Sequence, residues 1–375
     1  KQTLPPIPSP PPGLELSMGN YDVALLIIGW ACVCVCGSEA GNECRGSGTA
    51  TQRTELHIHL DGSVSVDTLL EIAKNRNLTI PGVGRPRNKA DIWQALENVN
   101  STWERFDVVN NIAGGHVGSL RIVAERFGDR QAAAGVTYTE VRYDPVRIAT
   151  SDYARESIPV EAAVETITAG LRTAAERHGI AIYSLLCAMR GQNASACENV
   201  ASLVAKVKSE ELGGVVGMDL AGDEPHFNNS EYIECFRRAK LELGLNTTVH
   251  VGEAVRPLDV KTAVLDMLVD RIGHGYAMVE DKNVLEIFQN SSVHIEACPP
   301  GAKRKGVLDS IKVYKELGFS FGLNEDDPSS YFEGCTPESV EEIAKNDLHF
   351  TDHDISKCHE DSYAARFGPQ NTYLC

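Results

Sequence analysis

The sequence predicts an α/β fold, a (β/α)8 TIM barrel with extra helices inserted after the first strand. Short apolar segments rich in β-branched residues alternate with longer stretches of helical periodicity. Eight strands, each followed by a helix, are typical of this barrel, which takes about 250 residues plus insertions. Imidazole and carboxylate groups also recur at the ends of the predicted strands, where such barrels hold their active sites.

The eight predicted strands lie at residues 54–60, 135–143, 180–188, 214–220, 246–251, 271–275, 292–297 and 318–324. Helical periodicity occupies much of the chain between them, at residues 65–76, 117–134, 160–178, 198–212, 230–243, 258–268, 280–289 and 307–317. The stretch 77–116 fits no single strand–helix step. We therefore expect it to form short helices between the first and second strands.

One predicted helix shows its apolar face clearly. Ala169, Leu171, Ala174 and Ala175 supply that face, and Gly179 follows the last helical residue. Glycine at this place is a common helix C-terminus, because it adopts the left-handed conformation without a Cβ clash.

The barrel is expected to begin near Arg53, so the chain divides into an extension at 1–50 and a single barrel domain at 51–375. Residues 1–17 are rich in proline, which predicts a disordered or extended segment. The segment 18–40 holds an apolar run followed by small residues, as in a secretory signal, but it lacks the cationic start of one. The run is too short for a comfortable membrane-spanning helix, so we expect no stable membrane insertion.

The charge balance limits the class of partner. The net charge is −17 and the pI about 5.1. An acidic surface repels phosphate backbones and anionic lipid, so nucleic acid is not an expected partner. A neutral small molecule fits this charge, and the sequence indicates no protein partner.

Two further features bear on the cellular compartment. Asn-x-Ser/Thr acceptors for N-glycosylation occur at Asn77, Asn100, Asn193, Asn228, Asn246 and Asn290. The chain has 11 cysteines, and those beyond the N-terminal region lack the dense spacing of a disulfide scaffold. For most of these cysteines, a free buried thiol is at least as good an interpretation as a disulfide. The sequence therefore does not decide the cellular compartment.

The first predicted strand carries two histidines near its end. His57 and His59 lie two residues apart, so their side chains point to the same face, roughly 6.6 Å apart along the strand. Two imidazoles at the mouth of a barrel are well placed to bind a metal ion. A lone His-x-His also occurs by chance in solvated strands, so this pair needs support from elsewhere in the chain.

Other strand ends supply that support. The fifth strand offers His250 with Glu253 three residues on, and the sixth ends in His274 between two glycines. The eighth is followed by Asp326 and Asp327, two adjacent carboxylates that are costly to bury unless they are paired or bound to metal. A core histidine bonded to backbone, or a turn with an Asx cap, is the structural alternative at each place.

Three histidines and one aspartate are a plausible set of ligands for zinc, which in catalytic sites also keeps a position for water. Bound zinc lowers the pKa of that water towards neutrality and so makes hydroxide available. A second possible zinc pattern, His294 and Glu296 with Cys298, half-matches the signature of another class of zinc deaminase. No Cys-x-x-Cys follows it, so we interpret this segment as a barrel strand.

The sequence resembles the adenosine deaminase family. Six stretches carry the resemblance, in the family's order: residues 55–63 (ELHIHLDGS), 135–145 (GVTYTEVRYDP), 219–224 (DLAGDE), 250–254 (HVGEA), 271–275 (RIGHG) and 323–328 (LNEDDP). The resemblance covers roughly residues 54–367. It implies a (β/α)8 barrel, one bound zinc ion and a cytoplasmic location, with secretion as the alternative from segment 18–40 and the glycosylation acceptors.

The resemblance also implies a role for each matching residue. His57, His59, His250 and Asp326 would bind zinc. Glu253 would protonate purine N1, and His274 would orient or deprotonate the attacking water. The substrate would be bound by His59, Asp61 at the ribose, the backbone N–H of Gly222, and Asp327 at the purine. Burial beside the purine is expected to raise the pKa of Glu253 so that it can donate a proton.

The expected activity is hydrolytic deamination of adenosine and 2′-deoxyadenosine to inosine and 2′-deoxyinosine, with release of ammonia. Asp61 favours a nucleoside, because the branch that acts on N6-methylated nucleotides usually has Asn there. Two regions depart from the family pattern: the loop 299–306 at the pocket rim and the lid region 77–116. In the lid region, two roles are open for Trp93, Leu96, Trp103 and Phe106. They either line the pocket or pack in the core. The alternatives are an adenine or modified-purine deaminase and a catalytically weak binding or signalling relative.

Overall fold

The computed structural model describes residues 52–253, 256–329 and 335–369. The predicted extension at 1–50, with its signal-like segment, lies outside these residues. Regular structure begins at Arg53, the first residue of β1, as the alternation of apolar segments predicts.

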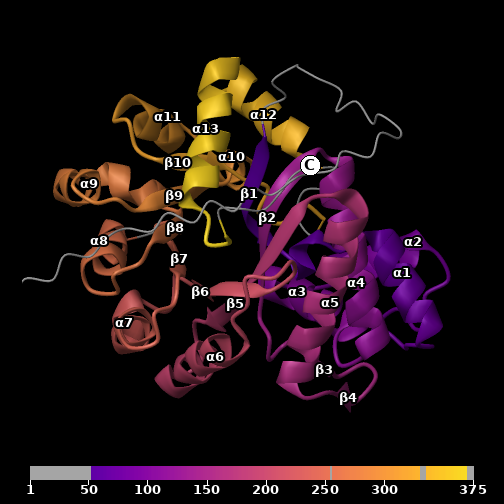
Figure 1. Cartoon of the computed structure of the whole chain (residues 1–375). Helices are drawn as coiled ribbons and strands as arrows, with labels where there is room; N and C mark the ends of the chain where they lie inside the picture. Colours follow the sequence, from indigo (N-terminus) through magenta and orange to yellow (C-terminus); the bar gives the residue numbers. More distant parts are fainter. Residues whose placement is uncertain (1–51, 254–255, 330–334, 370–375) are drawn as a thin grey trace, which may run out of the picture. The chain divides into compact units, whose positions relative to one another are not determined.

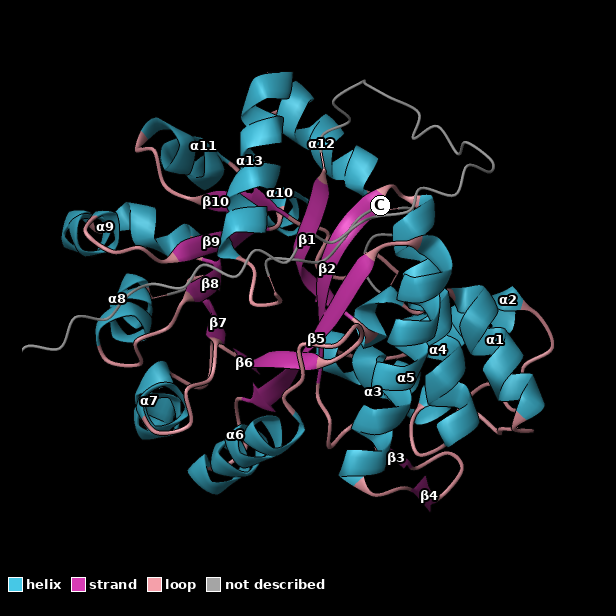
Figure 2. Cartoon of the chain, in the orientation of Figure 1, coloured by secondary structure: helices cyan, strands magenta, loops and turns pink. Residues whose placement is uncertain are grey.

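Eight parallel strands form the centre of the described fold, and helices surround them (Figures 1 and 2). Neighbouring strands follow the order β1-β2-β5-β6-β7-β8-β9-β10. Their bounds are β1 (Arg53–His59), β2 (Val136–Tyr143), β5 (Ala181–Met189), β6 (Val215–Ala221), β7 (Thr247–Val251), β8 (Arg271–His274), β9 (His294–Ala297) and β10 (Phe321–Leu323). All eight predicted strands are confirmed, with ends that differ by up to three residues.

The barrel closes just after β10, at the segment that carries Asp326. Ile58 pairs with Asp326 in a parallel bridge. The His59 backbone N–H donates to the Asp326 carbonyl oxygen at 3.0 Å, and the Asp326 N–H donates to the His57 carbonyl oxygen at 2.9 Å. The predicted TIM barrel is therefore confirmed, and its seam runs through three of the predicted site residues.

Thirteen helices occur among the described residues, most of them in the connections between strands. They are α1 (Val66–Asn75), α2 (Lys89–Glu97), α3 (Thr102–Ala113), α4 (Val117–Ala133), α5 (Val160–His178), α6 (Ala194–Val207), α7 (Ile233–Leu241), α8 (Pro257–Leu265), α9 (Lys282–Gln289), α10 (Pro299–Lys305), α11 (Asp309–Glu316), α12 (Pro337–Asn346) and α13 (Asp352–Ala365). Helices α2 and α3 confirm the predicted insertion after the first strand.

Helix α5 shows both the strength and the limit of reading a helix face from sequence. Leu171, Ala174 and Ala175 are buried, as predicted, whereas Ala169 is exposed. Two residues correspond to about 200° around a helix, so Ala169 and Leu171 cannot share a face. Gly179 ends the helix with a φ of 65°, the left-handed conformation that the sequence predicts.

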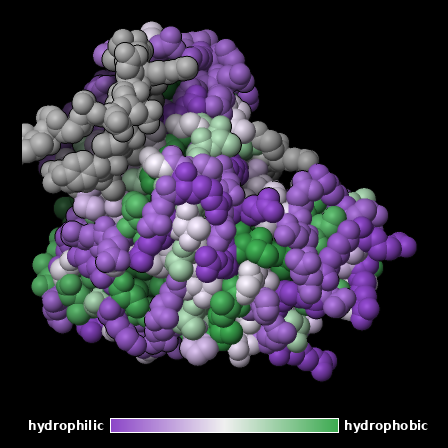
Figure 3. Space-filling model, turned by 45° about the vertical axis from the view of Figure 1, so that its right-hand side comes forward, coloured by the Kyte–Doolittle hydropathy of each residue, from purple (hydrophilic) through white to green (hydrophobic). Residues whose placement is uncertain are grey.

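Hydrophilic residues dominate the face of the molecule drawn in Figure 3, and hydrophobic residues form separate small groups on it. Among the described residues, no helix is both long and apolar enough to cross a lipid bilayer.

Candidate metal centre and active site

The carboxyl ends of the strands bring the predicted zinc ligands together. His57 and His59 come from β1, His250 from β7, and Asp326 from the segment that follows β10. His59 Nε2 lies 3.0 Å from His250 Nε2. Asp326 Oδ1 lies 3.6 Å from both His57 Nε2 and His59 Nε2. Four side chains from distant parts of the sequence therefore converge.

The spacing of these atoms fits a zinc ion. Zinc binds imidazole nitrogen at about 2.0–2.1 Å, so two ligands of a tetrahedral site lie about 3.4 Å apart. The distances in this cluster fall close to that value. His57 Nε2 is buried and has no hydrogen-bond partner, which is costly unless a metal ion accepts its lone pair. The residues present thus fit zinc, and the donor set of imidazole and carboxylate agrees with it.

Two buried carboxylates fix the orientation of two of the histidine rings. Glu296 on β9 lies 2.8 Å from His57 Nδ1, and Asp219 on β6 lies 3.0 Å from His250 Nδ1. These contacts place the ring protons on Nδ1 and present the Nε2 lone pairs to a metal ion. The guanidinium of Arg142 donates to Glu296 at 2.6 Å and to Asp219 at 3.2 Å.

Both carboxylates stay ionised in this setting. Burial opposes the charge of Asp219, but His250 and Arg142 outweigh it and hold the pKa of Asp219 below its ordinary value. Burial likewise opposes the charge of Glu296, yet Arg142 and Arg271 hold its pKa well below the usual range. Glu296 and Asp219 were not among the residues predicted from sequence. The signal was there, since a carboxylate inside an apolar strand needs a partner.

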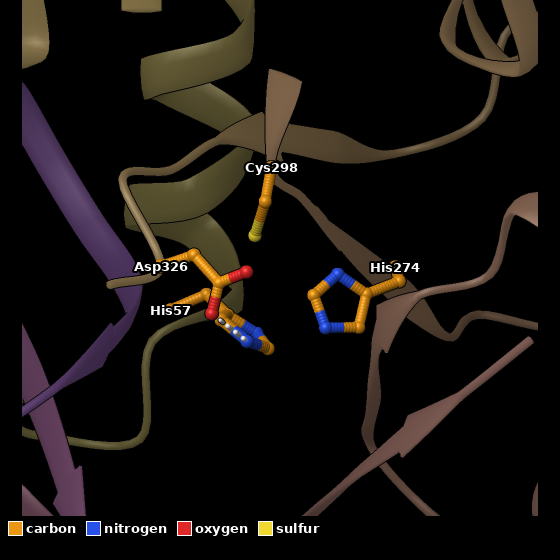
Figure 4. A group of neighbouring side chains, drawn as sticks. All are labelled: His57, His274, Cys298 and Asp326. Carbon is orange, nitrogen blue, oxygen red and sulfur yellow. Dashed lines mark ion pairs between the residues drawn. The ribbon is translucent and has the colours of Figure 1, made fainter. Parts of the chain in front are cut away.

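Cys298 lies beside the cluster, as Figure 4 shows together with His57, His274 and Asp326. Burial raises the pKa of the Cys298 thiol well above its ordinary value. The sulfur is therefore protonated near neutral pH, and a metal ion binds thiolate rather than thiol. Cys298 follows strand β9, so the interpretation of this segment as a barrel strand is confirmed.

His274 faces the cluster from the end of β8. Its ring centroid lies 4.6 Å from that of His57 and 5.2 Å from that of His250. Burial lowers the pKa of His274 to about 3, although the neighbouring Glu253 favours its charge. The ring is therefore neutral. Its Nδ1 is buried without a hydrogen-bond partner.

Backbone strain is concentrated at this place. His274 and Asp326 both have a φ of 69°, which is uncommon for residues other than glycine. Such conformations persist only where the surrounding structure enforces them, and they cluster at active sites. Here the barrel seam enforces the conformation of Asp326 through its backbone hydrogen bonds to β1.

Glu253 differs from the expectation for a proton donor. Burial favours its neutral form, but His274 and Lys305 outweigh burial and lower its pKa. Lys305 Nζ forms an ion pair with Glu253 Oε1. Lys305 is the last residue of α10, so the segment that departs from the family, 299–306, forms a helix that places a cation against Glu253. The pKa of Glu253 is therefore lowered in the protein without substrate, and the rise expected beside a bound purine stays a prediction.

A pocket of about 600 Å³ opens over the cluster, within the range of small-molecule sites. Asp61, Gly222, Glu253, His274 and Asp327 all line it, so the structure brings the predicted substrate and proton-transfer residues to one cavity.

The polar residues of this pocket are held in defined environments. Burial, and then the negative charge of Asp326, raise the pKa of Asp327 well above its ordinary value. Asp61 accepts a hydrogen bond from Asn110 Nδ2 at 2.8 Å. Gly222 has a φ of 99°, and a Cβ there would lie 2.9 Å from the Arg190 backbone nitrogen. Only glycine fits that position, which leaves the Gly222 backbone open to a ligand.

The inserted helices cover part of the pocket. Trp103 and Phe106 of α3 line it. Leu96 of α2 is buried in the core, and Trp93 packs against the core. Two of the four aromatic or apolar residues singled out in this region therefore face the cavity.

Comparison with known proteins decides the family. A sequence profile of the family described as adenosine deaminase matches residues 52–373. The chain belongs to the adenosine deaminase family. It is thus a deaminase of the hydrolase class, in a metal-dependent family. Adenosine deaminase from Mus musculus is 28% identical over 335 residues, covering 85% of this chain and 93% of that protein. Adenosine deaminase from Xenopus tropicalis is 31% identical over 347 residues, covering 85% and 92%.

Solved structures share the fold at lower sequence identity. An adenine deaminase from Arthrobacter aurescens is 20% identical with a TM-score of 0.72, covering 86% of this chain and 95% of that chain. An amidohydrolase with bound zinc from Burkholderia ambifaria is 20% identical with a TM-score of 0.73, covering 88% and 92%. An N6-methyl-AMP deaminase from Arabidopsis thaliana is 22% identical with a TM-score of 0.69, covering 85% and 93%.

Proposed function

We propose that this chain is a zinc-dependent deaminase of adenosine and 2′-deoxyadenosine, which forms inosine or 2′-deoxyinosine and ammonia. The observation that carries the proposal is that His57, His59, His250 and Asp326 belong to overlapping groups of neighbouring ligand atoms, and that all of them except His57 line one pocket. That pocket also holds Glu253 and His274, two groups able to move protons.

The four ligands would hold zinc through three imidazole Nε2 atoms and one carboxylate oxygen. Zinc, when bound, supplies a water whose pKa lies near neutrality and which can therefore act as hydroxide. The neutral ring of His274 has a nitrogen that can accept a hydrogen bond from this nucleophile and so orient it. It would accept the proton itself only with a pKa closer to neutrality. Glu253 is suited to give a proton to N1 of the purine ring, which makes C6 more electrophilic.

Other side chains would bind and orient the nucleoside. Burial and the neighbouring Asp326 raise the pKa of Asp327, which favours the protonated form that would donate a hydrogen bond to a purine nitrogen. The Gly222 backbone N–H would donate to another ring nitrogen, and Asp61 would accept from ribose hydroxyls. Trp103 and Phe106 would cover the apolar face of the base and exclude water from it.

Glu253 has to take up a proton from solvent when the substrate binds. In the protein alone, the pKa of Glu253 is lowered, and the cation paired with its carboxylate is Lys305, since the His274 ring is neutral. A purine that enters beside Glu253 removes water and displaces the ammonium group of Lys305. Both changes favour the neutral acid.

The charge of the pocket favours a nucleoside over a nucleotide. More carboxylates than cationic side chains line the cavity. Of the four cationic side chains in the lining, Arg147 pairs with Asp107 and Lys305 pairs with Glu253, and the lining holds eight carboxylates. A 5′-phosphate would therefore meet net negative potential, while a neutral ribose meets hydrogen-bonding partners.

Ammonia release from the zinc-loaded protein tests the proposal against its alternatives. The substrates are adenosine, 2′-deoxyadenosine, adenine, AMP and N6-methyl-AMP. We expect both nucleosides to be turned over with kcat/KM at least about tenfold above the other three, since 1.4 kcal/mol of discrimination gives that ratio. Preference for adenine would identify the alternative deaminase. Tight adenosine binding without ammonia release would identify a catalytically weak relative.

A further inference from the structure

Five of the six N-glycosylation acceptors lie on the exposed surface of the fold. Asn77, Asn100, Asn193, Asn228 and Asn290 are all exposed, whereas Asn246 is half-buried. The hydroxyl residues that complete four of these acceptors, Thr79, Ser195, Ser230 and Ser292, are exposed as well. An oligosaccharide is bulky and hydrophilic, so only an asparagine that reaches solvent is compatible with the folded chain.

The side chains of Asn193 and Asn228 form their local hydrogen bonds through Oδ1, whereas Asn290 Nδ2 donates to the Glu286 carbonyl oxygen at 2.8 Å. A glycosylated Nδ2 keeps one N–H, so that bond is compatible with a glycan. At the start of α6, Asn193 Oδ1 accepts from the Ala196 backbone N–H at 3.0 Å. Asn228 Oδ1 accepts from the Ser230 backbone N–H at 2.9 Å. A glycan is attached at Nδ2, so both caps survive the modification.

The sixth acceptor is different. Asn246 precedes β7, and its Nδ2 donates to the Val216 carbonyl oxygen at 3.0 Å between two barrel strands. A glycan at this nitrogen would have to pass through the packed edge of the barrel. Asn246 therefore serves as an internal negative control.

The cysteines give an independent observation. Cys197 of α6 and Cys235 of α7 form a disulfide with a Cα–Cα distance of 6.2 Å, within the range that a disulfide spans. Disulfides form and persist in oxidising compartments and are rare in the cytosol. The other cysteines of the described residues, Cys187, Cys298, Cys335 and Cys358, are buried. In the described part of the chain, no thiol is thus left on the surface to oxidise.

We propose that this protein matures in the secretory pathway, with N-linked glycans at Asn77, Asn100, Asn193, Asn228 and Asn290 and a Cys197–Cys235 disulfide. Of the two locations expected from sequence, this proposal takes the secreted one and not the cytoplasmic one that the family resemblance implies. The inference rests on the exposure of five asparagines and on the Cys197–Cys235 disulfide. It does not depend on which purine the pocket binds.

Peptide mapping of the native protein tests the proposal. An amidase that removes N-glycans converts the glycosylated asparagine to aspartate, and heavy-oxygen water labels each such site. We expect the label at the five exposed acceptors and none at Asn246. Without reduction, the peptide that holds Cys197 should stay linked to the peptide that holds Cys235. An intact mass equal to that of the bare chain, or free Cys197 and Cys235 thiols, would overturn the proposal.

Variants made in a secreting eukaryotic host test the role of exposure at each acceptor. Each single change of the five exposed asparagines to Gln should lower the mass of the secreted protein by one glycan. N246Q should leave the glycan mass unchanged, and all variants should retain the zinc content of the parent. A glycan at Asn246 would contradict the argument from burial. Secreted protein that carries no glycan at the five exposed acceptors would contradict it as well.

Discussion

At the scale of single residues, Glu253 and Lys305 set the protonation of the site. Glu253 lies in the pocket beside the neutral ring of His274, where burial alone would favour the protonated acid. The ammonium group of Lys305 opposes burial and keeps the carboxylate charged. The same residue that departs from the family pattern therefore controls when the proposed proton donor can act.

Replacing Lys305 by Met is expected to shift the pH profile of kcat/KM. On the proposed mechanism, activity requires protonated Glu253 and is lost as the pH rises through the pKa of Glu253. Lys305 lowers that pKa, so its removal raises the pKa and moves the basic limb of the profile to higher pH. The measurement is kcat/KM for adenosine from about pH 3 to about pH 9, because the pKa of Glu253 in the free protein lies below its ordinary value of about 4.3.

A neighbouring lysine on the same helix provides the control for this variant. Lys303 pairs with Asp347, away from the pocket. K303M should keep the parent profile, and K305R should largely restore it. A K305M profile that superimposes on that of the parent would show that Lys305 does not act on the proton donor.

Glu253→Gln keeps the shape of the side chain and removes the acidic proton. General acid catalysis contributes roughly 10²–10⁴-fold, so we expect kcat to fall by at least that factor. Zinc content should stay at one ion per chain, because Glu253 is not among the converging ligand atoms. The two measurements are ammonia release and metal analysis of the dialysed protein. Turnover at the parent rate would exclude Glu253 as the proton donor.

At the scale of elements, the strands were predictable and several helices were not. Buried parallel strands are short continuous apolar runs, and that pattern alone located all eight. Helices α12 and α13 were not predicted, because they follow the last strand and the repeating strand–helix order no longer indicates them. Helix α10 begins with two prolines, which read as a loop although proline is well tolerated in a first turn.

In the candidate site, too, some residues could be predicted from the strands, and others depend on contacts that only the folded chain creates. The convergence of its proposed ligands was predictable because they lie at or near the ends of strands, and the ends of parallel strands meet at one face of a barrel. Glu296 was missed because its contact with His57 joins β9 to β1, a relation that only the closed barrel creates. Lys305 was missed because its approach to Glu253 depends on α10 being a helix.

The His57 ring packs against Gly273 of β8, where the absence of a side chain allows the close approach. A Cβ at Gly273 would lie 2.6 Å from His57 Cε1, closer than real Cβ contacts allow. Gly273→Ala should therefore displace the ring and weaken zinc binding by about 10–100-fold, the loss expected when a ligand is misoriented. Zinc affinity is measured by competition with a chromogenic chelator.

Gly301 of α10 offers the matched control. A Cβ there would lie 3.5 Å from Asp326 Oδ2, an ordinary contact, so G301A should bind zinc like the parent. If G273A also binds zinc like the parent, the close approach of β8 does not position His57.

At the scale of the whole molecule, the proposed zinc ion would join distant parts of the barrel. The proposed ligands come from β1, from β7, which is the fifth of the eight strands counted from β1, and from the segment after β10 that holds Asp326. A ligand that binds only the folded chain stabilises it by mass action. The metal would therefore hold the barrel closed as well as supply its chemistry.

Removal of the metal is thus expected to lower the melting temperature as well as the activity. At a free zinc concentration a hundredfold above Kd, binding contributes about 2.7 kcal/mol. For a domain of more than 300 residues, that corresponds to a fall of about 4 °C on chelation. Differential scanning calorimetry of the protein with zinc and with chelator measures the difference, and added zinc should restore both stability and ammonia release. D326A, which lacks one ligand at the seam, should melt at nearly the same temperature in zinc and in chelator. If the parent also melts at one temperature in both conditions, zinc does not bind across the barrel, and the four converging side chains need another explanation.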